Sequence, residues 1–319
     1  MMPELCAKLD DIHAAARRIA PYAHKTPVLH SSSLDRILDA ELYFKCENLQ
    51  RVGAFKFRGA CNAVNSLSPE ELERGVATHS SGNHAAALAL SAKLAGTTAH
   101  IVMPNNAPGV KKVAVEGYGA QITYCEPTLE AREGTLARIL EEEGRVLIHP
   151  YNDARIIAGQ GTASLELLAE VQDLEVVLAP VGGGGLLSGT SIAVSESLPS
   201  AKVFGAEPLN ADDAYRSMET GEIQPSINPQ TLADGLLTSL GELTFAVIQE
   251  RCSGIVTVSE ASIVEAMRLV WERMKIVIEP SAAVPVAALL EKRSEIPGHR
   301  IGVILSGGNV DLERLPWMK

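Results

Sequence analysis

Apolar and polar positions along this chain follow two different periods. Short runs of β-branched and other apolar residues predict strands, at Leu42–Cys46, Val76–His79, Ala99–Met103, Gln121–Cys125, Val146–Ile148, Glu175–Val181, Val203–Glu207, Ile255–Val258 and Ile301–Ser306. Longer segments rich in alanine, leucine and glutamate predict helices, at Phe57–Leu67, Asn83–Ala95, Lys111–Tyr118, Leu129–Glu143, Gly161–Glu170, Leu186–Leu198, Glu260–Met274 and Ala282–Glu291. Because strands and helices alternate, the pattern predicts an α/β fold with mostly parallel strands.

The order of these segments predicts two domains. Residues 76–148 form a compact strand–helix series, and similar segments lie on both sides of it. We therefore expect a small domain over residues 75–151, inserted into a large domain made of residues 1–74 and 152–319. Four polar segments follow predicted strands or lie in nearby loops, where open α/β sheets bind their ligands: Ser80–His84, Gly182–Gly185, Glu207–Asp213 and Ser306–Asn309. Both domains contribute, so we expect a site in the cleft between them.

The composition narrows the class of protein. Of the 319 residues, 46% are hydrophobic and 21% charged, which predicts a folded protein with a large core. The net charge of −11 and the lack of a basic run argue against partners such as nucleic acid or an anionic membrane. We expect neither a signal peptide nor a membrane-spanning helix. The five cysteines are scattered, which favours reduced thiols and a cytoplasmic location over disulfides or zinc.

Lys56 is the first candidate for chemistry. It lies between Phe55 and Phe57, although only 4% of the chain is aromatic. Such neighbours indicate an amine partly withdrawn from water, whose lowered pKa would allow it to form an imine with an aldehyde. A surface lysine beside a buried phenylalanine is the simpler alternative.

A run of four glycines is the second candidate. Gly182, Gly183, Gly184 and Gly185 follow a predicted strand and precede a predicted helix. Backbone N–H groups in such a turn can converge on an anion at a helix N-terminus. The spacing fits neither a P-loop nor a dinucleotide-binding fingerprint. One ligand, the phosphorylated aldehyde pyridoxal phosphate, would explain both the glycines and Lys56.

Three further segments have both a structural and a functional interpretation. Ser80–His84 could cap a helix, or its N–H groups and hydroxyls could bind a substrate carboxylate. Ser306–Asn309 could be a plain turn, or the Ser306 hydroxyl could bind a pyridine nitrogen. Glu207–Asp213 could be an acidic loop, or its carboxylates and carbonyls could bind Mg²⁺ or Ca²⁺.

These motifs, in this order, resemble the fold-type-II pyridoxal-phosphate enzymes, in particular the serine racemases, the serine/threonine dehydratases and the hydroxyaspartate dehydratases. The resemblance covers nearly the whole chain and rests on segments in family order, at Lys25–Pro27, Glu47–Gln50, Ala54–Gly59, Ser80–His84, Ala158–Thr162, Gly182–Gly185, Gly205–Pro208 and Glu279–Ser281. It implies a fold like that of the tryptophan synthase β subunit, with two open α/β domains and the cofactor in the cleft. It also implies a homodimer that acts on a small amino acid.

The resemblance assigns a role to each candidate residue. Lys56 would be joined covalently to the cofactor and act as base at Cα, while Ser81 would be a second acid/base on the opposite face of the substrate. The cofactor would be bound by Phe55, Lys56, Asn83, Gly182, Gly183, Gly184, Gly185 and Ser306. The substrate would be bound by Ser80, Ser81, Asn83, His84, Arg132 and Thr238. Mg²⁺, Ca²⁺ or Mn²⁺ would be bound by Glu207, the Ala211 carbonyl and Asp213.

The activity that the resemblance implies is that of a serine/threonine ammonia-lyase, with serine racemisation as a second reaction of the same site. One alternative is a threo-3-hydroxyaspartate dehydratase, in which Arg132 meets the extra carboxylate. A β-replacement synthase of the cysteine-synthase kind is an alternative from another class, which the motif around Lys56 disfavours. Three positions depart from the serine racemase pattern and leave the preferred substrate open, namely Thr238 for serine, Tyr151 for asparagine and Ala86 for the glutamine of many relatives.

Overall fold

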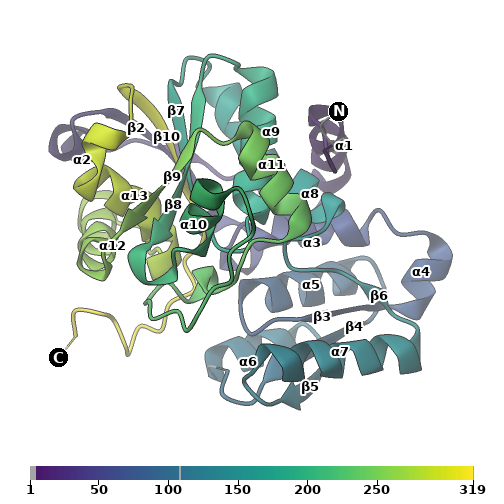
Figure 1. Ribbon diagram of the computed structural model, residues 1–319. Helices are drawn as coiled ribbons and strands as arrows, with labels where there is room; N and C mark the ends of the chain where they lie inside the picture. The colour runs from purple at the N-terminus through teal and green to yellow at the C-terminus, as the bar shows by residue number, and fades with distance from the viewer. Residues whose placement is uncertain (1–4, 108, 319) are drawn as a thin grey trace.

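Two sheets form the framework of the protein (Figure 1). The computed structural model describes residues 5–107 and 109–318. The larger sheet has the strand order β1–β2–β10–β7–β8–β9. Its strands are β1 Val28–Leu29, β2 Glu41–Cys46, β7 Val176–Pro180, β8 Lys202–Pro208, β9 Gly254–Val258 and β10 Arg300–Leu305. The β1–β2 pair is antiparallel and the other pairs of this sheet are parallel.

The smaller sheet is parallel throughout and has the order β5–β4–β3–β6. Its strands are β3 Val76–His79, β4 Ala99–Pro104, β5 Gln121–Cys125 and β6 Val146–Leu147. They lie inside the span 75–151 that the sequence predicts for the small domain. The predicted α/β fold with two mostly parallel sheets is confirmed.

Helices connect the strands. They are α1 Leu9–Ile19, α2 Ser32–Leu38, α3 Lys56–Val64, α4 Pro69–Arg74, α5 Asn83–Leu94, α6 Gly109–Gly117, α7 Leu129–Glu143, α8 Ala154–Glu170, α9 Gly185–Ser197, α10 Asp213–Thr220, α11 Glu242–Arg251, α12 Glu260–Met274 and α13 Pro280–Glu291. Within residues 5–107 and 109–318, none of the helices has the length and apolar character needed to cross a bilayer.

The sequence predictions identify most elements but miss some bounds and some short helices. Helix α8 begins at Ala154 instead of Gly161, because the Asp153 side chain caps it by accepting from Arg155 N. Helices α1, α2, α4, α10 and α11 were not predicted. For α4 the signal was present, since Ser68 and Glu71 form a capping box around Pro69 at the first helical position.

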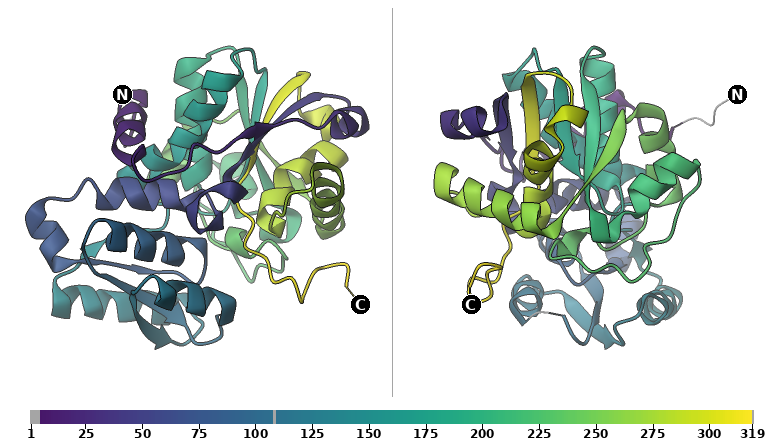
Figure 2. Two further views of the ribbon diagram at one scale, coloured as in Figure 1. Left: turned by 180° about the vertical axis from the view of Figure 1, so that it is seen from behind. Right: turned by 60° about the vertical axis from the view of Figure 1, so that its left-hand side comes forward.

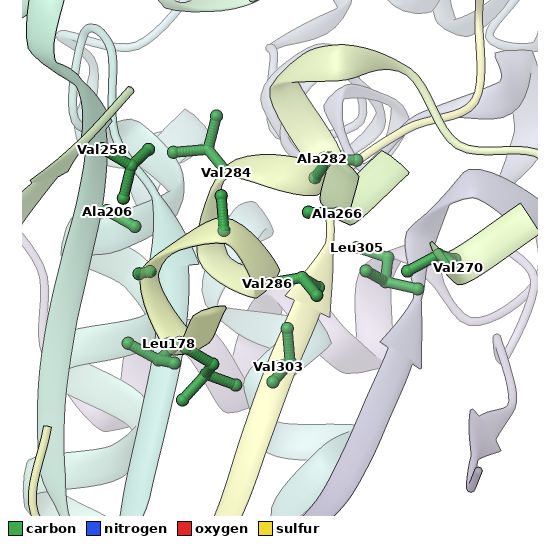
Figure 3. Packing of buried hydrophobic residues seen from close by; sticks show 14 of the residues in the cluster. Leu178, Ala206, Val258, Ala266, Val270, Ala282, Val284, Val286, Val303 and Leu305 are labelled. Carbon is green, nitrogen blue, oxygen red and sulfur yellow. The ribbon is translucent and has the colours of Figure 1, made fainter. Parts of the chain in front are cut away.

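Helices cover both faces of the larger sheet (Figures 1 and 2). Helices α2, α12 and α13 bury one apolar cluster against it, and α8, α9, α10 and α11 bury another. Figure 3 shows Val284 and Val286 of α13 with Leu178 of β7 and Val303 of β10 in the first cluster. Each such side chain contributes roughly 1.5–3 kcal/mol when fully buried, so the sheet is a firm base for the loops at its carboxyl end.

Helix α3 packs against both halves of the molecule. It contacts α8, which covers the larger sheet, and α5, which packs on the smaller one. A Cβ atom on Gly159 of α8 would lie 2.6 Å from Gly59 Cα, so only glycine permits this approach of α3 and α8. Ala63 and Val64 of α3 belong to the core of the smaller sheet. The first residue of α3, Lys56, therefore lies where the two halves meet.

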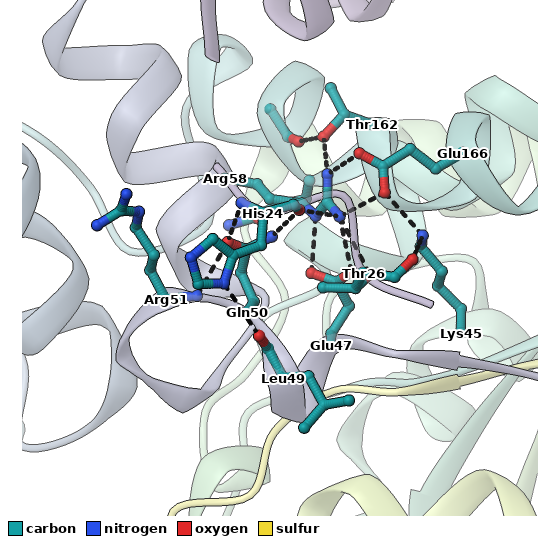
Figure 4. Close-up of polar contacts among 12 residues, drawn as sticks. His24, Thr26, Lys45, Glu47, Leu49, Gln50, Arg51, Arg58, Thr162 and Glu166 are labelled. Atoms are coloured by element: carbon teal, nitrogen blue, oxygen red, sulfur yellow. Dashed lines mark hydrogen bonds and ion pairs between the residues drawn. The ribbon is translucent and has the colours of Figure 1, made fainter. Parts of the chain in front are cut away.

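Four charged side chains, which we call the charge cluster, fix α3 in place (Figure 4). Arg58 is fully buried and donates to both oxygens of Glu47 and to both oxygens of Glu166 on α8, at 2.7–2.8 Å. Lys45 of β2 donates to Glu166 at 2.7 Å and to the Thr26 carbonyl at 2.6 Å. Two cations thus neutralise two carboxylates, and the cluster joins the N-terminal segment, β2, α3 and α8.

We expect Arg58→Met to lower the free energy of unfolding by about 3–5 kcal/mol, because buried Glu47 would lose its ion pair while Glu166 would keep only Lys45. Urea denaturation followed by circular dichroism measures this loss. Arg138→Met is the matched control, since it breaks an exposed ion pair with Glu142 on α7 and should cost less than about 0.5 kcal/mol. Similar losses in both variants would contradict a stabilising role for the charge cluster.

Candidate active site

Lys56 opens α3, and protein surrounds its amine. Its Nζ donates to the Pro150 carbonyl at 2.7 Å and lies 5.3 Å from the centroid of the Phe55 ring. Burial lowers the pKa of this amine from its ordinary 10.5 to about 8. Within the described residues no carboxylate forms an ion pair with it. The amine is therefore partly neutral near pH 8, and the neutral form is the one that attacks an aldehyde.

The end of β10 lies beside the start of α3. The Phe55 N–H donates to the Ser306 carbonyl at 3.0 Å, and Ala54 pairs with Gly307 in an isolated antiparallel bridge. Ser306 is buried at this position. Two segments from opposite ends of the chain thus place Phe55, Lys56 and Ser306 next to one another, as one shared ligand would require.

The four glycines form a buried turn between β7 and α9. In the part of the chain that the structure describes, the N–H groups of Gly182, Gly183, Gly184 and Gly185 meet no acceptor. Buried backbone donors are nearly always satisfied, so these groups fit an anion bound at the N-terminus of α9. The turn itself also requires glycine, because Gly184 has a φ of +89° and a Cβ on Gly183 would lie 2.3 Å from the Tyr151 ring.

The N-terminus of α5 supplies a second set of backbone donors. Gly82 is the N-cap and no side chain caps the helix, so the interpretation of Ser80–His84 as a side-chain cap is wrong. Ser80 Oγ instead accepts from Gly82 N at 3.2 Å. The N–H groups of Ser81, Asn83 and His84 have no acceptor among the described residues. With the positive end of the helix dipole, they can bind a carboxylate.

Asn83 joins this helix to the larger half of the molecule. Its Nδ2 donates to Glu279 Oε1 at 2.9 Å, and its Oδ1 accepts from Asn309 Nδ2 at 2.9 Å. Glu279 precedes α13, and Asn309 follows β10. Asn83, predicted to contact the cofactor, is therefore also a bridge between the two sheets.

His84 is buried, and its ring is poorly suited to binding an anion. Nε2 contacts the Ile148 carbonyl at 3.3 Å, and Nδ1 has no partner within the described chain. Burial, followed by the charge of Lys56, lowers the pKa of His84 well below 6.5. The neutral ring then donates from Nε2 and presents only an acceptor at Nδ1. The backbone N–H of His84, not its ring, fits the predicted contact with a substrate carboxylate.

Tyr151 and Thr238, two positions that depart from the serine racemase pattern, lie near each other. Burial raises the pKa of Tyr151, and the nearby Thr238 side chain acts in the opposite direction. The Tyr151 ring lies against Gly183 and makes a perpendicular contact with His149 at 4.6 Å between centroids. These contacts place both residues beside the glycine turn.

Arg132 lies on α7 and approaches the end of β3. Its Nε donates to the Thr128 carbonyl at 3.2 Å, and it forms no ion pair with any described residue. Burial and then the charge of Arg132 lower the pKa of His79 to about 4. Since His79 directly precedes Ser80, the guanidinium belongs to the same region as the N-terminus of α5.

Glu207 and Asp213 form a second polar site. Both are fully buried, and Glu207 accepts from Ala214 N at 3.0 Å and Tyr215 N at 2.9 Å. Neither carboxylate oxygen of Asp213 has a hydrogen-bond partner in the described chain. Burial, then the charge of Asp213, raises the pKa of Glu207 well above 4.5, and burial raises the pKa of Asp213 from 3.8 to about 7. Two such carboxyl groups need either protons or a bound cation.

The donor set around these carboxylates is small. In the described residues no three His, Cys, Asp or Glu side chains gather in a way that could hold a metal ion. A divalent ion here would therefore need a backbone carbonyl such as that of Ala211, together with water. The sequence interpretation places Asp213 in a loop, but the structure places it in the first turn of α10.

The sequence interpretation missed His79 and His149. Their ring centroids lie 6.3 Å apart with the rings perpendicular. His79 ends β3, and His149 lies just after β6. Because β3 and β6 are parallel neighbours, the carboxyl ends of these two strands meet at one edge of the sheet. The sequence could have identified both histidines, because polar residues at the carboxyl ends of parallel strands are candidates for a binding site.

The chain is similar to known proteins over nearly its whole length. A family model described as pyridoxal-phosphate dependent enzyme matches residues 19–307. Serine racemase of Dictyostelium discoideum is 52% identical over 99% of this chain and 98% of its own, and β-hydroxyaspartate dehydratase of Paracoccus denitrificans is 49% identical over 97% and 98%. Among solved structures, the T.th. threonine deaminase superposes with a TM-score of 0.92, at 46% identity, over 96% of this chain and 99% of that one.

The geometry fits the cofactor of that family. A desolvated amine that no described carboxylate pairs with suits the aldehyde of pyridoxal phosphate. The free N–H groups of the glycine turn suit its phosphate. Both features are properties of this chain's own residues.

We expect Lys56 of the cofactor-free protein to react with pyridoxal phosphate at a rate that rises with pH around a midpoint near 8, because its pKa is lowered. Borohydride trapping followed by peptide mass spectrometry measures the labelled fraction of each lysine. The exposed Lys93 of α5 is an internal control, and at pH 8 it should be labelled to a smaller extent than Lys56. Equal labelling of the two lysines at pH 8 would show that Lys56 is not desolvated.

Proposed function

The chain belongs to the family of pyridoxal-phosphate-dependent enzymes, and from that premise we propose that it is an ammonia-lyase for β-hydroxy amino acids that also racemises serine. The carrying observation is the Lys56 amine, which is desolvated. Among the described residues it has no counterion, and the segments beside it have backbone donors without an acceptor. The named relatives, a serine racemase, a β-hydroxyaspartate dehydratase and a threonine deaminase, support the same substrate class.

The residues that would bind the cofactor come from both halves of the molecule. Lys56 would hold its aldehyde carbon, the N–H groups of Gly182–Gly185 its phosphate, and Ser306 its pyridine nitrogen. Phe55 would pack near the ring, and Asn83 would hydrogen bond to it. When bound, the cofactor withdraws electrons from the substrate's Cα and so acidifies the proton there.

The substrate carboxylate fits the N-terminus of α5. The free N–H groups of Ser81, Asn83 and His84 would bind it, and the hydroxyls of Ser80 and Ser81 lie on the same segment. Binding at this end orients the amino acid by its charge, because the helix dipole favours an anion there. Thr238, which lies near Tyr151, would contact the substrate from the other segment.

Lys56 would take the Cα proton. Its pKa of about 8 leaves a substantial neutral fraction near neutral pH, which a base requires. Loss of the β-hydroxyl, followed by hydrolysis, then gives a 2-oxo acid and ammonia. If Ser81 instead returns a proton to the opposite face of Cα, the product is the D-amino acid. The two reactions thus differ in the residue that acts after proton removal.

We further propose that Mg²⁺, Ca²⁺ or Mn²⁺ binds Glu207, the Ala211 carbonyl and Asp213. The buried, unpartnered carboxylate of Asp213 supports this site. The charge of Asp213 also raises the pKa of Tyr151, which lies beside the glycine turn. A cation bound to Asp213 would therefore change the electrostatic potential near that turn. A homodimer stays a prediction of the family resemblance, and a cytoplasmic location stays a prediction from the scattered cysteines.

The wild-type enzyme should release ammonia from β-hydroxy amino acids, and a panel of L-serine, L-threonine, D-serine and L-threo-3-hydroxyaspartate tests this. Lys56→Ala should lose both the visible absorbance of the bound cofactor and the activity, whereas Lys93→Ala, which removes an exposed lysine of α5, should keep both. Chelation should lower the activity if the cation site is functional. A panel without ammonia release, or a Lys56→Ala variant that keeps the absorbance, would refute the proposal.

Ser81→Ala should lower the rate of L-serine racemisation about 100-fold or more, because it removes the second acid/base, while elimination falls much less. Chiral chromatography and ammonia release measure the two products in one reaction. Ser80→Ala is the matched variant, since it removes the neighbouring hydroxyl and should affect both reactions by similar factors. If Ser81→Ala slows the two reactions equally, Ser81 is a binding residue only.

A further inference from the structure

The segment Ala158–Thr162 of α8 has no role in the proposed mechanism, although it is one of the motifs on which the family resemblance rests. All of its residues are buried. Gly159 permits the close approach of Gly59, and Thr162 Oγ1 accepts from Arg58 Nη1 at 3.2 Å. The segment therefore lies against the first turn of α3, which begins with the proposed base.

A side chain of this segment completes the hydrogen bonds of that turn. In a regular α-helix the Gly59 N–H would donate to the Phe55 carbonyl, four residues earlier. That carbonyl instead accepts from Arg58 N at 3.0 Å. The Gly59 N–H donates to Gln160 Oε1 of α8 at 3.2 Å. Because no side chain at the start of α3 caps the helix, Gln160 does from another helix what a capping residue normally does.

The burial of Gln160 has a cost that packing does not explain. Its side chain is fully buried, and Nε2 has no hydrogen-bond partner among the described residues. A buried amide donor without a partner destabilises a protein, whereas an apolar side chain of the same size would avoid that penalty. A Cβ on Gly59 would lie 2.4 Å from Nε2, so α3 also leaves room for the amide. The acceptor Oε1 is the part of Gln160 that an apolar residue could not supply.

The backbone of Lys56 is therefore held on both sides. Before it, the Phe55 N–H donates to the Ser306 carbonyl at 3.0 Å, and after it, Gly59 is held by Gln160. In the proposed mechanism the amine serves two places, the aldehyde carbon of the cofactor and the substrate's Cα. A small displacement of a reacting group costs much of its rate. Two backbone anchors within three residues of the lysine leave the motion to its side chain.

We propose that Gln160 is a positioning residue of the active site, which holds the first turn of α3 through Oε1 so that Lys56 Nζ reaches the substrate's Cα and stays out of water. This inference rests on the proposed role of Lys56 as the base. The charge cluster holds α3 through the Arg58 side chain, whereas Gln160 holds the backbone of the first turn itself. The two contacts therefore have separate effects, and Gln160 can be tested with the charge cluster intact.

The test compares variants of the cofactor-bound enzyme on the β-hydroxy amino acid of the panel that the wild type converts fastest. Gln160→Met removes the acceptor at similar size and should lower kcat about tenfold or more, with KM changed less than about twofold, because the groups that bind the substrate stay in place. Gln160→Glu keeps an acceptor oxygen, and burial favours its protonated carboxyl group, so it should recover most of kcat. Ser164→Ala is the matched control, since it removes a buried 2.9 Å hydrogen bond from α8 to Thr190 on α9, and it should leave both constants unchanged.

Labelling of the cofactor-free protein gives a readout without turnover. Water that reaches the amine in Gln160→Met would raise the pKa of Lys56 from about 8, and a rise of about one unit lowers the neutral fraction at pH 8 about fivefold. Borohydride trapping with pyridoxal phosphate at pH 8 should therefore label Lys56 about fivefold more slowly in Gln160→Met than in Ser164→Ala. The labelling of the exposed Lys93 should be the same in both variants.

A Gln160→Met variant that matches Ser164→Ala in kcat and in the labelling of Lys56 overturns the inference, whatever its melting temperature. A Gln160→Glu variant as slow as Gln160→Met does so too, because the acceptor would then have no effect. If Gln160→Met does not fold, Gln160→Asn, which draws the acceptor back by one methylene, takes its place under the same criteria. If the wild type releases no ammonia from any substrate of the panel, the proposed function fails, and the labelling still decides whether Gln160 positions Lys56.

Discussion

The charge cluster of Arg58, Glu47, Glu166 and Lys45 is the constraint on which the site depends. Four charges inside a protein are tolerated only when each is paired and hydrogen bonded, so the segments that supply them must come together in one arrangement. Those segments are β2, the turn after it, the first turns of α3 and the last turns of α8. Lys56 lies two residues before Arg58, and its position follows from that arrangement. Lys56 Nζ donates to the Pro150 carbonyl, and within the described residues it forms no ion pair.

Around this fixed helix, the site is assembled from segments far apart in the sequence. The bridge between Ala54 and Gly307 places the end of β10 beside the lysine. Asn83 bonds to Glu279 and Asn309, which ties the first residue of α5 to the larger half of the molecule. A change in the relative position of the two sheets would break these bonds. The Asn83 contacts therefore couple the N-terminus of α5 to the position of the larger sheet.

The electrostatics of the site assign proton transfer and anion binding to different groups. Desolvation keeps Lys56 reactive, and it keeps His79, His84 and His149 neutral near pH 7. The groups available for anions are instead backbone N–H groups, which have no acceptor among the described residues at the glycine turn and at the N-terminus of α5. Fixed dipoles of this kind bind negative charge without exchanging protons with the substrate. Proton transfer can then be confined to Lys56 and, as we propose, Ser81.

The sequence alone determined the class of fold and most strands and helices, and it predicted the chemistry of Lys56 and the glycine turn, because periodicity and local motifs depend on neighbouring residues. It did not determine α10 and α11, the absence of a side-chain cap on α5, or the tautomer of His149. Each of these depends on partners brought together by folding, such as the two N–H groups on Nδ1 of His149 or the contact of Asn152 with Leu243 N at the start of α11. Hydrogen-bond partners and desolvation are set by packing between distant segments, so only the tertiary structure decided which side chains in the site donate, which accept and which are neutral.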